Sequence, residues 1–440
     1  MTKSVSCPAL LVSAPASGQG KTTVVAALAR YHRNQGRHVR VFKTGPDFID
    51  PMIHEQASGN PVYQLDLWMV GESQSKQLLF EAALEADLIL IEGVMGLYDG
   101  EPSSADLAVC FGVPVAAVID ASAMAQTFGA IASGLASYRP EMEFAGVIAN
   151  RVASEGHGEM LQQSIASQSH WLGSLPRAED ITLPERHLGL YQAADIDDLD
   201  KKLDAAAELI GLTPMARLPK PVSFTLFREQ VVSPLLQGQR IAVAKDPAFS
   251  FVYRANLDLL TAMGAEITFF SPLEDNALPV ADSVYLPGGY PELYLSQLSA
   301  NQEMKLAINE HCQSGKPMVA ECGGMLYLLE TLTDKMGNSG DMAGVIPASA
   351  SIQKRLAGLG AQAADLGSGE LRGHTFHYSS FDKAPSFELY ATRHPRGTEG
   401  EGVLKNDGLV ASYVHWYFPS NPQAAADLFL QNDAQPKSGQ

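Results

Sequence analysis

Short apolar runs alternate with helical patterns through the first half of the chain. The runs that predict strands cover residues 9–12, 39–42, 88–91, 114–119, 145–149 and 171–175. The patterns that predict helices cover residues 24–31, 124–137 and 195–212. Continuous apolar runs are typical of strands that are buried on both faces, as in a parallel sheet. The alternation therefore predicts a mostly parallel sheet with helices on both faces.

The pattern breaks down over residues 213–239, where prolines interrupt it and no period holds. A second series then begins. Its predicted strands cover residues 241–244, 267–270, 283–286, 317–320 and 409–414, and its predicted helices cover 254–263, 302–314 and 325–330. We therefore predict an α/β protein with two doubly wound, mostly parallel sheet domains, 1–212 and 240–435, joined by a linker over 213–239.

A loop of small residues lies between the first strand and the first helix. The predicted ATP-binding residues are Gly18, Gln19, Gly20, Lys21, Thr22 and Thr23. Backbone N–H groups converge in such a loop, and the helix N-terminus adds partial positive charge. Lys21 would reach the terminal phosphates and the Thr22 hydroxyl would bind Mg²⁺. The motif lacks its first glycine, because that position holds Pro15. The alternative is a helix N-cap with an incidental lysine.

Charged residues follow two of the predicted strands. Lys43, Asp47 and Asp50 come after the second strand, and Glu92 ends the strand over 88–91, in front of a glycine loop that carries Asp99. Ligands bind at the carboxyl edge of open α/β sheets. A carboxylate at a strand end in a phosphate-loop protein commonly lies near Mg²⁺. The alternatives are a solvated acidic turn and a charge that only caps the strand.

Cys322 lies where a predicted strand turns into a predicted helix, just before Gly323 and Gly324. A tight turn of this kind exposes a nucleophile at the sheet edge. We expect the helix N-terminus to lower the thiol pKa. The backbone N–H groups of Gly289 and Gly323 are candidates for an oxyanion hole. The alternative is a buried structural cysteine, which is how we interpret the other three cysteines.

A cysteine nucleophile needs a base. The candidates are His374, His377, His394 and His415. His415 follows an apolar strand and would also lie at a strand end, so we favour it. We interpret His374 and His377 as structural.

Composition narrows the functional classes. The chain has 440 residues, with 31 Lys plus Arg against 49 Asp plus Glu, and a formal net charge of −18. This charge argues against nucleic acid or an anionic membrane as the main partner. The four cysteines have neither metal-ligand spacing nor disulfide density, which favours the cytoplasm. With no basic leader and no apolar stretch of about 18 residues, we expect neither export nor membrane insertion.

Motifs in both halves carry a resemblance to known families. The second half resembles a class I glutamine amidotransferase domain with a flavodoxin-like fold, through LPGGYPELY, ECGGMLYL and YVHWYFP. The first half resembles the dethiobiotin synthetase-like ATP-binding fold, through APASGQGKTT, KTGPDFIDP and IEGVMGLYDG. Together, over about residues 5–430, the chain resembles the cobyrinic acid a,c-diamide synthase family.

This resemblance implies a ligase of cobalamin biosynthesis. ATP and Mg²⁺ would activate the a and c acetates of cobyrinic or hydrogenobyrinic acid as acyl phosphates, and ammonia from glutamine would convert them to amides. The implied partners are the small molecules ATP, glutamine and a corrin polycarboxylate, and a homodimer stays open. A typical class I triad has His-x-Glu, but position 417 holds Tyr417.

The resemblance also implies roles for individual residues. The implied metal ligands are Thr22, Asp47 and Glu92; the implied corrin-binding residues are Phe48, Ile49 and Asp99; the implied glutaminase nucleophile and its base are Cys322 and His415. Related alternatives are cobyric acid synthase, which is longer, and an amidase of nickel-sirohydrochlorin. An alternative of another class is a non-catalytic phosphate-loop switch protein with a degenerate second domain.

Overall fold

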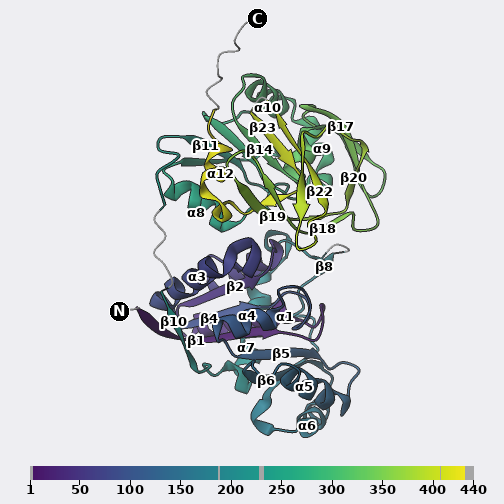
Figure 1. The fold of residues 1–440 in the computed structure, drawn as a ribbon. Helices are drawn as coiled ribbons and strands as arrows, with labels where there is room; N and C mark the ends of the chain where they lie inside the picture. The colour runs from purple at the N-terminus through teal and green to yellow at the C-terminus, as the bar shows by residue number, and fades with distance from the viewer. Residues whose placement is uncertain (1–2, 187–188, 227–231, 407, 432–440) are drawn as a thin grey trace, which may run out of the picture. The chain divides into compact units, whose positions relative to one another are not determined.

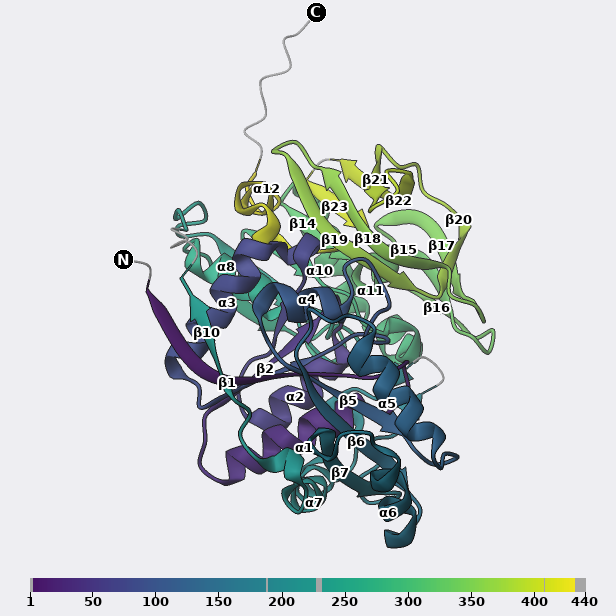
Figure 2. The same ribbon diagram turned by 60° about the horizontal axis from the view of Figure 1, so that its bottom comes forward.

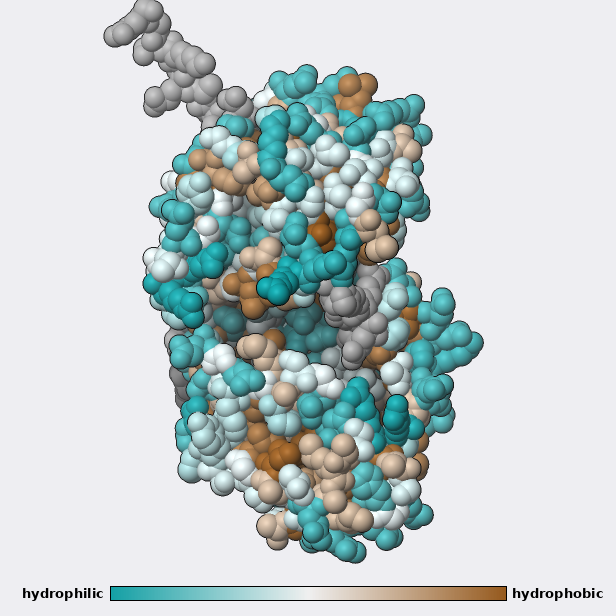
Figure 3. All heavy atoms as spheres, turned by 90° about the vertical axis from the view of Figure 1, so that its right-hand side faces the viewer, coloured by the Kyte–Doolittle hydropathy of each residue, from teal (hydrophilic) through white to brown (hydrophobic). Residues whose placement is uncertain are grey.

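The structure is a computed structural model, which describes residues 3–186, 189–226, 232–406 and 408–431. It divides into two compact units, Met1–Gln230 and Val231–Gln440, called unit 1 and unit 2 below (Figure 1). Hydrophilic residues cover most of the face shown in Figure 3, with apolar residues in small groups. Among the residues that the structure describes, none of the helices has both the length and the apolar character that a membrane span requires.

Unit 1 is built on a parallel sheet with the strand order β3-β2-β4-β1-β5-β6-β7. Its strands are β1 (Ser4–Ser13), β2 (Val39–Thr44), β3 (Tyr63–Leu65), β4 (Leu88–Glu92), β5 (Val115–Asp120), β6 (Phe144–Val152) and β7 (Trp171–Pro176). Its helices are α1 (Lys21–Asn34), α2 (Ile49–Ser58), α3 (Glu72–Glu85), α4 (Ser104–Phe111), α5 (Thr127–Ser137), α6 (Glu155–Ser164) and α7 (Leu199–Gly211). Two short strands, β8 (Glu185–Arg186) and β9 (Gly189–Leu190), pair with each other.

The central strands of unit 1 are buried on both faces. On β1, Leu10 and Val12 pack into one apolar core, whereas Leu11 between them packs into the other. The first core contains side chains of α1, α2 and α7, and the second contains side chains of α3 to α6 (Figure 2). The prediction of a sheet with helices on both faces is confirmed.

Part of the segment predicted as a linker belongs to the sheet of unit 1. Strand β10 (Pro221–Thr225) pairs antiparallel with the first half of β1. Its Phe224 is buried while the residues on either side are exposed, which is the alternation of a half-buried strand. Pro221 is its first residue, a position where proline is tolerated in a strand. The prolines hid this short alternation. Residues 227–231 of the segment, and the predicted boundary at 435, lie outside the described residues.

Unit 2 contains a ten-stranded sheet with the order β12-β11-β13-β14-β23-β22-β21-β18-β19-β24. The parallel strands are β12 (Glu266–Phe270), β11 (Arg240–Ala244), β13 (Ser283–Leu286), β14 (Met318–Glu321) and β23 (Leu409–Ser412). The antiparallel strands are β22 (Glu399–Asn406), β21 (Leu389–Arg393), β18 (Gly358–Asp365), β19 (Glu370–His377) and β24 (His415–Trp416). The parallel part was predicted, but the antiparallel extension was not.

Helices and a smaller sheet complete unit 2. The helices are α8 (Arg254–Ala262), α9 (Leu295–Ala300), α10 (Gln302–Gln313), α11 (Gly323–Leu328) and α12 (Pro422–Asp427). The second sheet has the order β16-β15-β17-β20, from β15 (Leu329–Thr333), β16 (Ser339–Asp341), β17 (Ile346–Ile352) and β20 (Ser379–Lys383). The helix predicted over 325–330 therefore starts earlier and gives way to β15 at Leu329.

Candidate functional site

The predicted phosphate loop joins β1 to α1 and is fixed by neighbouring strands. Gly20 is the N-cap of α1 with φ 91°, and a Cβ atom there would lie 2.2 Å from Nδ2 of Asn150. Both the backbone conformation and the close approach therefore require glycine. Asn150 donates to the Gln19 carbonyl (2.9 Å), and the Gln19 side chain accepts from the Asp120 N–H (2.8 Å). The ends of β5 and β6 thus hold the loop in place.

Lys21 is buried beneath this loop. Its Nζ donates to the carbonyl of Met95 (2.7 Å) and to the carbonyl of Ala16 (3.3 Å). Burial lowers the pKa of the Lys21 ammonium, although the charge of Glu92 opposes this. Met95 has φ 52°, an uncommon conformation for a residue other than glycine, and its carbonyl accepts the bond from Lys21. Two backbone carbonyls therefore hold the ammonium that the sequence predicts to bind phosphate.

Glu92 is the centre of a buried charged cluster at the end of β4. Its carboxylate accepts a hydrogen bond from the Thr22 hydroxyl (2.9 Å), lies 3.5 Å from Nζ of Lys43, and is hydrogen-bonded to His54. Glu92 is 1% exposed and Lys43 is 2% exposed. Burial raises the pKa of Glu92, but Lys43 and His54 outweigh burial and lower it to about 2. Burial lowers the pKa of Lys43, but Glu92 and Asp50 outweigh burial and raise it above its ordinary value.

Asp47 caps helix α2 beside this cluster. Its Oδ1 accepts from the N–H groups of Ile49 (2.9 Å) and Asp50 (3.1 Å), and its Oδ2 lies 4.0 Å from Nζ of Lys43. Burial and the charge of Asp50 raise the pKa of Asp47 to about 8. Phe48 and Ile49 are half-buried at the start of α2. The structure therefore brings Asp47 and Glu92 to one lysine, Lys43.

Asp99 lies in the loop after β4 and is exposed. Its carboxylate accepts from the Gly96 N–H (3.1 Å), and a Cβ atom at Gly96 would lie 2.4 Å from the same carboxylate. The Asp99 charge helps to raise the pKa of Lys21, against the larger effect of burial. Asp99 thus shares a loop with Met95, the residue whose carbonyl holds Lys21.

The side-chain oxygens around Glu92 are suitable ligands for a magnesium ion that a nucleotide carries. In the described part of the chain, no group of three or more His, Cys, Asp or Glu side chains has the arrangement of a metal site. Mg²⁺ usually takes only one or two carboxylates, with phosphate and water as its other ligands. The Thr22 hydroxyl and the carboxylate of Glu92 in contact with it, with Asp47 nearby, are ligands of that kind.

Sequence reasoning missed the role of His54 in this cluster. His54 is fully buried on α2 and is hydrogen-bonded to Glu92. The signal was present, because Asp50 and His54 are four residues apart and share one face of a helix.

In unit 2, Cys322 occupies the turn from β14 to α11. It has φ 44° and ψ −105°, a strained conformation for a residue with a side chain. Its N–H donates to the Ser412 carbonyl (2.7 Å) on the neighbouring strand β23, and its carbonyl accepts from the Leu326 N–H (2.9 Å). The prediction of a strand-to-helix elbow at Cys322 is confirmed. Cys322 is only 7% exposed, so the prediction that this turn exposes the side chain at the sheet edge is wrong.

The thiol pKa runs against our expectation. Burial raises the pKa of Cys322 above its ordinary value, the charge of Glu292 adds to this, and the Gly323 N–H lowers it by less. The N–H at the start of α11 therefore acts in the predicted direction, but desolvation outweighs it and the net pKa of Cys322 is raised. Burial also lowers the pKa of His415 well below its ordinary value, and His374 adds to this effect. Both shifts favour the neutral form, a thiol at Cys322 and an uncharged imidazole at His415.

Close backbone packing explains the glycines around Cys322. A Cβ atom at Gly288 would lie 2.2 Å from the His415 ring, and one at Gly323 would lie 2.8 Å from the Gly289 nitrogen. Gly288 therefore packs against the imidazole of His415, and the next residue, Gly289, packs against Gly323 in the turn that follows Cys322. The backbones of Gly289 and Gly323, both predicted oxyanion donors, lie next to each other.

The four histidine candidates have different surroundings. His415 on β24 is 2% exposed and stacks on His374 with ring centroids 5.1 Å apart. His374 is hydrogen-bonded to the Tyr253 hydroxyl (2.7 Å). His377 is hydrogen-bonded to the Ser379 carbonyl (2.8 Å) and to Glu401 (3.2 Å), and His394 is only half-buried. Because β14 and β23 are parallel neighbours, His415 follows the strand next to β14, the strand that ends just before Cys322.

A buried carboxyl group near His415 was not predicted. Glu321 is 1% exposed, accepts from the Tyr285 hydroxyl (2.9 Å) and the Trp416 N–H (3.1 Å), and lies 3.9 Å from Nδ1 of His415. Burial raises the pKa of Glu321 to about 8, although both donors oppose this. Tyr417, where a typical triad has Glu, is fully buried.

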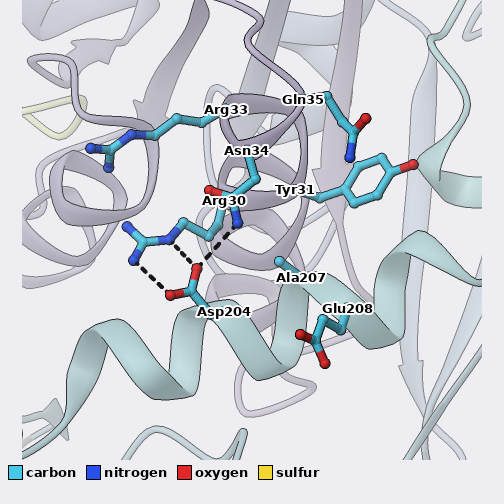
Figure 4. Close-up of a pocket in the computed structure, with 8 residues that line it drawn as sticks. All are labelled: Arg30, Tyr31, Arg33, Asn34, Gln35, Asp204, Ala207 and Glu208. Atoms are coloured by element: carbon cyan, nitrogen blue, oxygen red, sulfur yellow. Dashed lines mark hydrogen bonds and ion pairs between the residues drawn. The ribbon is translucent and has the colours of Figure 1, made fainter.

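A separate open cavity of about 600 Å³ lies between α1 and α7 (Figure 4). Arg30 on its wall donates to Asp204 (2.6 Å) and Asp200 (2.8 Å). The cavity is lined by residues of the second half of α1, whereas the phosphate loop precedes that helix. None of the predicted site residues lines it.

The fold and these two sites define a class of protein, a nucleotide-binding domain joined to a glutamine amidotransferase domain. Residues 10–190 match the model of the CobQ/CobB/MinD/ParA nucleotide binding domain. Residues 240–423 match the model of the CobB/CobQ-like glutamine amidotransferase domain. The α/β prediction with these two domain types is confirmed.

Full-length relatives narrow the class further. The chain is 58% identical to a hydrogenobyrinate a,c-diamide synthase of Stutzerimonas stutzeri (96% of this chain, 98% of the relative) and 56% identical to one of Pseudomonas aeruginosa (96% and 97%). It is 48% identical to a cobyrinate a,c-diamide synthase of Herminiimonas arsenicoxydans (96% of each). The chain belongs to the cobyrinate and hydrogenobyrinate a,c-diamide synthase family. It is therefore an amidotransferase of the ligase class, and the non-catalytic switch protein is excluded.

Proposed function

We propose that this enzyme converts the a and c acetates of hydrogenobyrinate to amides, with ATP and glutamine as co-substrates. The full-length match at 58% identity to a synthase of that name carries the proposal. The choice of the metal-free corrin follows the order of similarity, because the relatives at 58% and 56% are named for hydrogenobyrinate and the one at 48% for cobyrinate.

Unit 1 would activate each carboxylate. Ammonia does not displace an oxide or hydroxide from a carboxylate in water, because these are very poor leaving groups. If a carboxylate oxygen attacks the γ-phosphorus of ATP, ADP leaves and an acyl phosphate with a good leaving group forms. This step depends on positioning and on charge stabilisation. Lys21 would bind the phosphates when phosphate oxygens replace the Met95 and Ala16 carbonyls as acceptors of its hydrogen bonds. The backbone N–H groups of the loop from Gly18 to Thr23 would bind the phosphates as well.

The metal and corrin sites of unit 1 follow from the same arrangement. Mg²⁺, held by Thr22, Glu92 and Asp47, would neutralise phosphate charge when bound. Lys43 keeps Glu92 ionised, since the two lie 3.5 Å apart. We assign Phe48, Ile49 and Asp99 to the corrin because all three flank the carboxyl ends of β2 and β4.

Unit 2 would release ammonia from glutamine. Cys322 attacks the side-chain amide carbon as its proton moves to His415, and the Gly289 and Gly323 N–H groups would stabilise the oxyanion. The C–N bond breaks when His415 returns the proton to nitrogen, which leaves as ammonia. Water then hydrolyses the thioester to glutamate. The pKa shifts that favour a neutral thiol and a neutral imidazole support this mechanism, since the base receives its proton during attack.

The enzyme would work on small molecules in the cytoplasm. A formal net charge of −18 disfavours nucleic acid as a partner, and all four cysteines are free thiols.

One set of assays tests this function. Purified enzyme is incubated with ATP, glutamine and either hydrogenobyrinate, cobyrinate or nickel-sirohydrochlorin, and amides and ADP are measured. We expect two acid-to-amide conversions of hydrogenobyrinate, each with one ADP. Cys322→Ala should lose activity with glutamine and keep it with ammonium salts. Full glutamine-dependent activity of Cys322→Ala would contradict the mechanism, and a preference for another tetrapyrrole would reassign the substrate.

A further inference from the structure

The carboxyl group of Glu321 lies at the base of the candidate glutaminase site. Glu321 is the last residue of β14 and precedes Cys322 directly. It is 1% exposed, which is rare for a glutamate unless its oxygens are satisfied by other groups. Its Oε2 is 3.9 Å from Nδ1 of His415. A single residue thus links the strand that carries the nucleophile to the ring that serves as its base.

Two hydrogen bonds fix the orientation of this carboxyl group. The Trp416 N–H donates to Oε1 (3.1 Å), and the Tyr285 hydroxyl on β13 donates to Oε2 (2.9 Å). Trp416 follows His415 in the chain, so Glu321 binds the backbone of β24 through one oxygen and faces the imidazole with the other. Both bonds are of normal length, and both use Glu321 as acceptor.

The other sides of the imidazole are occupied by packing. Gly288 lies so close to the ring that a Cβ atom there would be 2.2 Å from Cε1 and 3.0 Å from Nδ1. His374 covers one face of the ring, with an angle of 19° between the two planes. The hydroxyl of Tyr253 in turn holds His374. The ring therefore has little freedom to rotate away from Glu321.

We propose that Glu321 is the positioning residue for His415, in place of the acidic residue that position 417 lacks. This proposal rests on the proposed glutaminase chemistry of Cys322. At 3.9 Å the contact is electrostatic rather than a hydrogen bond, and the ionised Glu321 carboxylate favours the imidazole proton on Nδ1, so that Nε2 is the nitrogen that accepts the thiol proton. When sulfur bonds to the amide carbon, the thiol proton moves to Nε2, and it returns to the leaving nitrogen as the C–N bond breaks. Glu321 exchanges no proton in these steps.

Position 417 cannot take this role in the present fold. Tyr417 is fully buried, and its ring packs edge-on against Tyr253 with centroids 5.5 Å apart. Strand β14, which pairs with β13 and β23 and not with β24, supplies the carboxyl group one residue before the nucleophile. The positioning carboxyl group is therefore adjacent to the nucleophile in sequence, whereas in a His-x-Glu triad it lies two residues after the histidine.

The test compares Glu321→Gln with the matched surface variant Glu330→Gln. Glutamate release from glutamine is measured at about pH 9, where the Glu321 carboxyl is ionised. A misplaced base costs on the order of 10²-fold, so we expect kcat of Glu321→Gln to fall by about that factor with KM little changed. Glu330→Gln should behave as the original enzyme, because Glu330 is exposed on the surface. Activity with ammonium salts should persist in both variants.

A spectroscopic readout separates positioning from packing. In ¹⁵N-histidine-labelled protein, the His415 signals are assigned by their loss in His415→Gln. We expect the Nδ1–H tautomer in the original enzyme and a shift towards Nε2–H in Glu321→Gln. An unchanged kcat, or a lower kcat with an unchanged tautomer, would overturn the proposal. Cys322→Ala tests the glutaminase itself, and full glutamine-dependent activity of this variant would contradict the proposed function. If Cys322→Ala loses that activity and Glu321→Gln keeps it, only the positioning role of Glu321 fails.

Discussion

Unit 1 and unit 2 both bury ionisable groups at the ends of central strands, and burial has opposite outcomes in the two. Lys43 and Glu92 stay charged although each is at most 2% exposed, because Lys43 lies 3.5 Å from Glu92 and 3.1 Å from Asp50. For Cys322 and His415, burial is the largest effect and favours the neutral form of each. A buried group keeps its charge only where opposite charge compensates for lost hydration.

The difference matches the chemistry that each unit would perform. Phosphoryl transfer needs charges fixed in place before the reaction, since the phosphate groups bring negative charge that must be met at once. Amide cleavage needs a proton that moves from sulfur to nitrogen and then to the leaving group. The charged pair Lys43 and Glu92 in unit 1 therefore indicates fixed electrostatics, whereas the neutral forms favoured for Cys322 and His415 in unit 2 indicate proton transfer.

The largest effect should come from removing a fixed charge. We expect Glu92→Gln to lower amidation by on the order of 10³-fold with glutamine or with ammonium salts, since both routes need the activated carboxylate. This distinguishes it from Cys322→Ala, which should affect only the glutamine route. ADP and amide formation with each nitrogen donor give the measurement. Glu85→Gln, at an exposed site of the same unit, is the control. Normal activity of Glu92→Gln with ammonium would contradict the assignment.

The second largest effect should come from a steric change beside His415. We expect Gly288→Ala to destabilise unit 2 by about 1–3 kcal/mol, because the new methyl group would meet the His415 ring. Glutaminase activity should fall with it, while ammonium-dependent activity persists. Gly134→Ala on α5 is the matched control, because nothing lies within 4 Å of its Cβ position. Urea unfolding curves measure both variants, and equal stability of the two would show that the close approach is relaxed in solution.

The pH dependence of stability should report the buried acid of unit 2. Glu321 has a pKa raised to about 8 by burial, so the folded state keeps a proton that the unfolded state has lost above about pH 4.5. Its contribution is therefore present at low pH and is lost as the pH rises towards 8, by at most about 1.4 kcal/mol per pH unit. Urea unfolding followed through Trp416 fluorescence from pH 5 to pH 9 measures this slope. Glu321→Gln should flatten it, and an equally steep slope in that variant would exclude Glu321 as its source.

The smallest effect should come from a pair outside both sites. Arg30 is bound to Asp204 (2.6 Å) and Asp200 (2.8 Å) beside the open cavity. Asp204 is 49% exposed, so solvent screens the pair and Asp204→Asn should cost at most about 1 kcal/mol. Thermal unfolding of unit 1 measures this, and activity with either nitrogen donor should not change. A loss of activity would mean that this cavity takes part in function.

The strand ends were the part of the sites that the sequence predicted well. A buried strand needs a continuous apolar run, so the first polar residue after the run marks the sheet edge, as at Glu92. The same reasoning found Cys322, because the glycines that follow it mark a tight turn.

Residues whose role depends on long-range packing were not predicted. His54 meets Glu92 across 38 positions of chain, and Tyr285 meets Glu321 across 36. The sequence identifies Glu321 only as a neighbour of Cys322, since no sequence pattern around it indicates which strand its side chain faces. The antiparallel strands of unit 2 were missed for a related reason, because many of their residues are exposed or half-buried and leave no continuous apolar run.

Strand β10 has a practical consequence for dividing the polypeptide. It covers residues 4–8 of β1, the same strand that leads into the phosphate loop. A recombinant fragment that stops at residue 212 would leave this stretch of β1 with unpaired backbone groups, which promote aggregation. A fragment that extends through Thr225 would keep the strand paired, and is the better starting point for studying nucleotide binding in isolation.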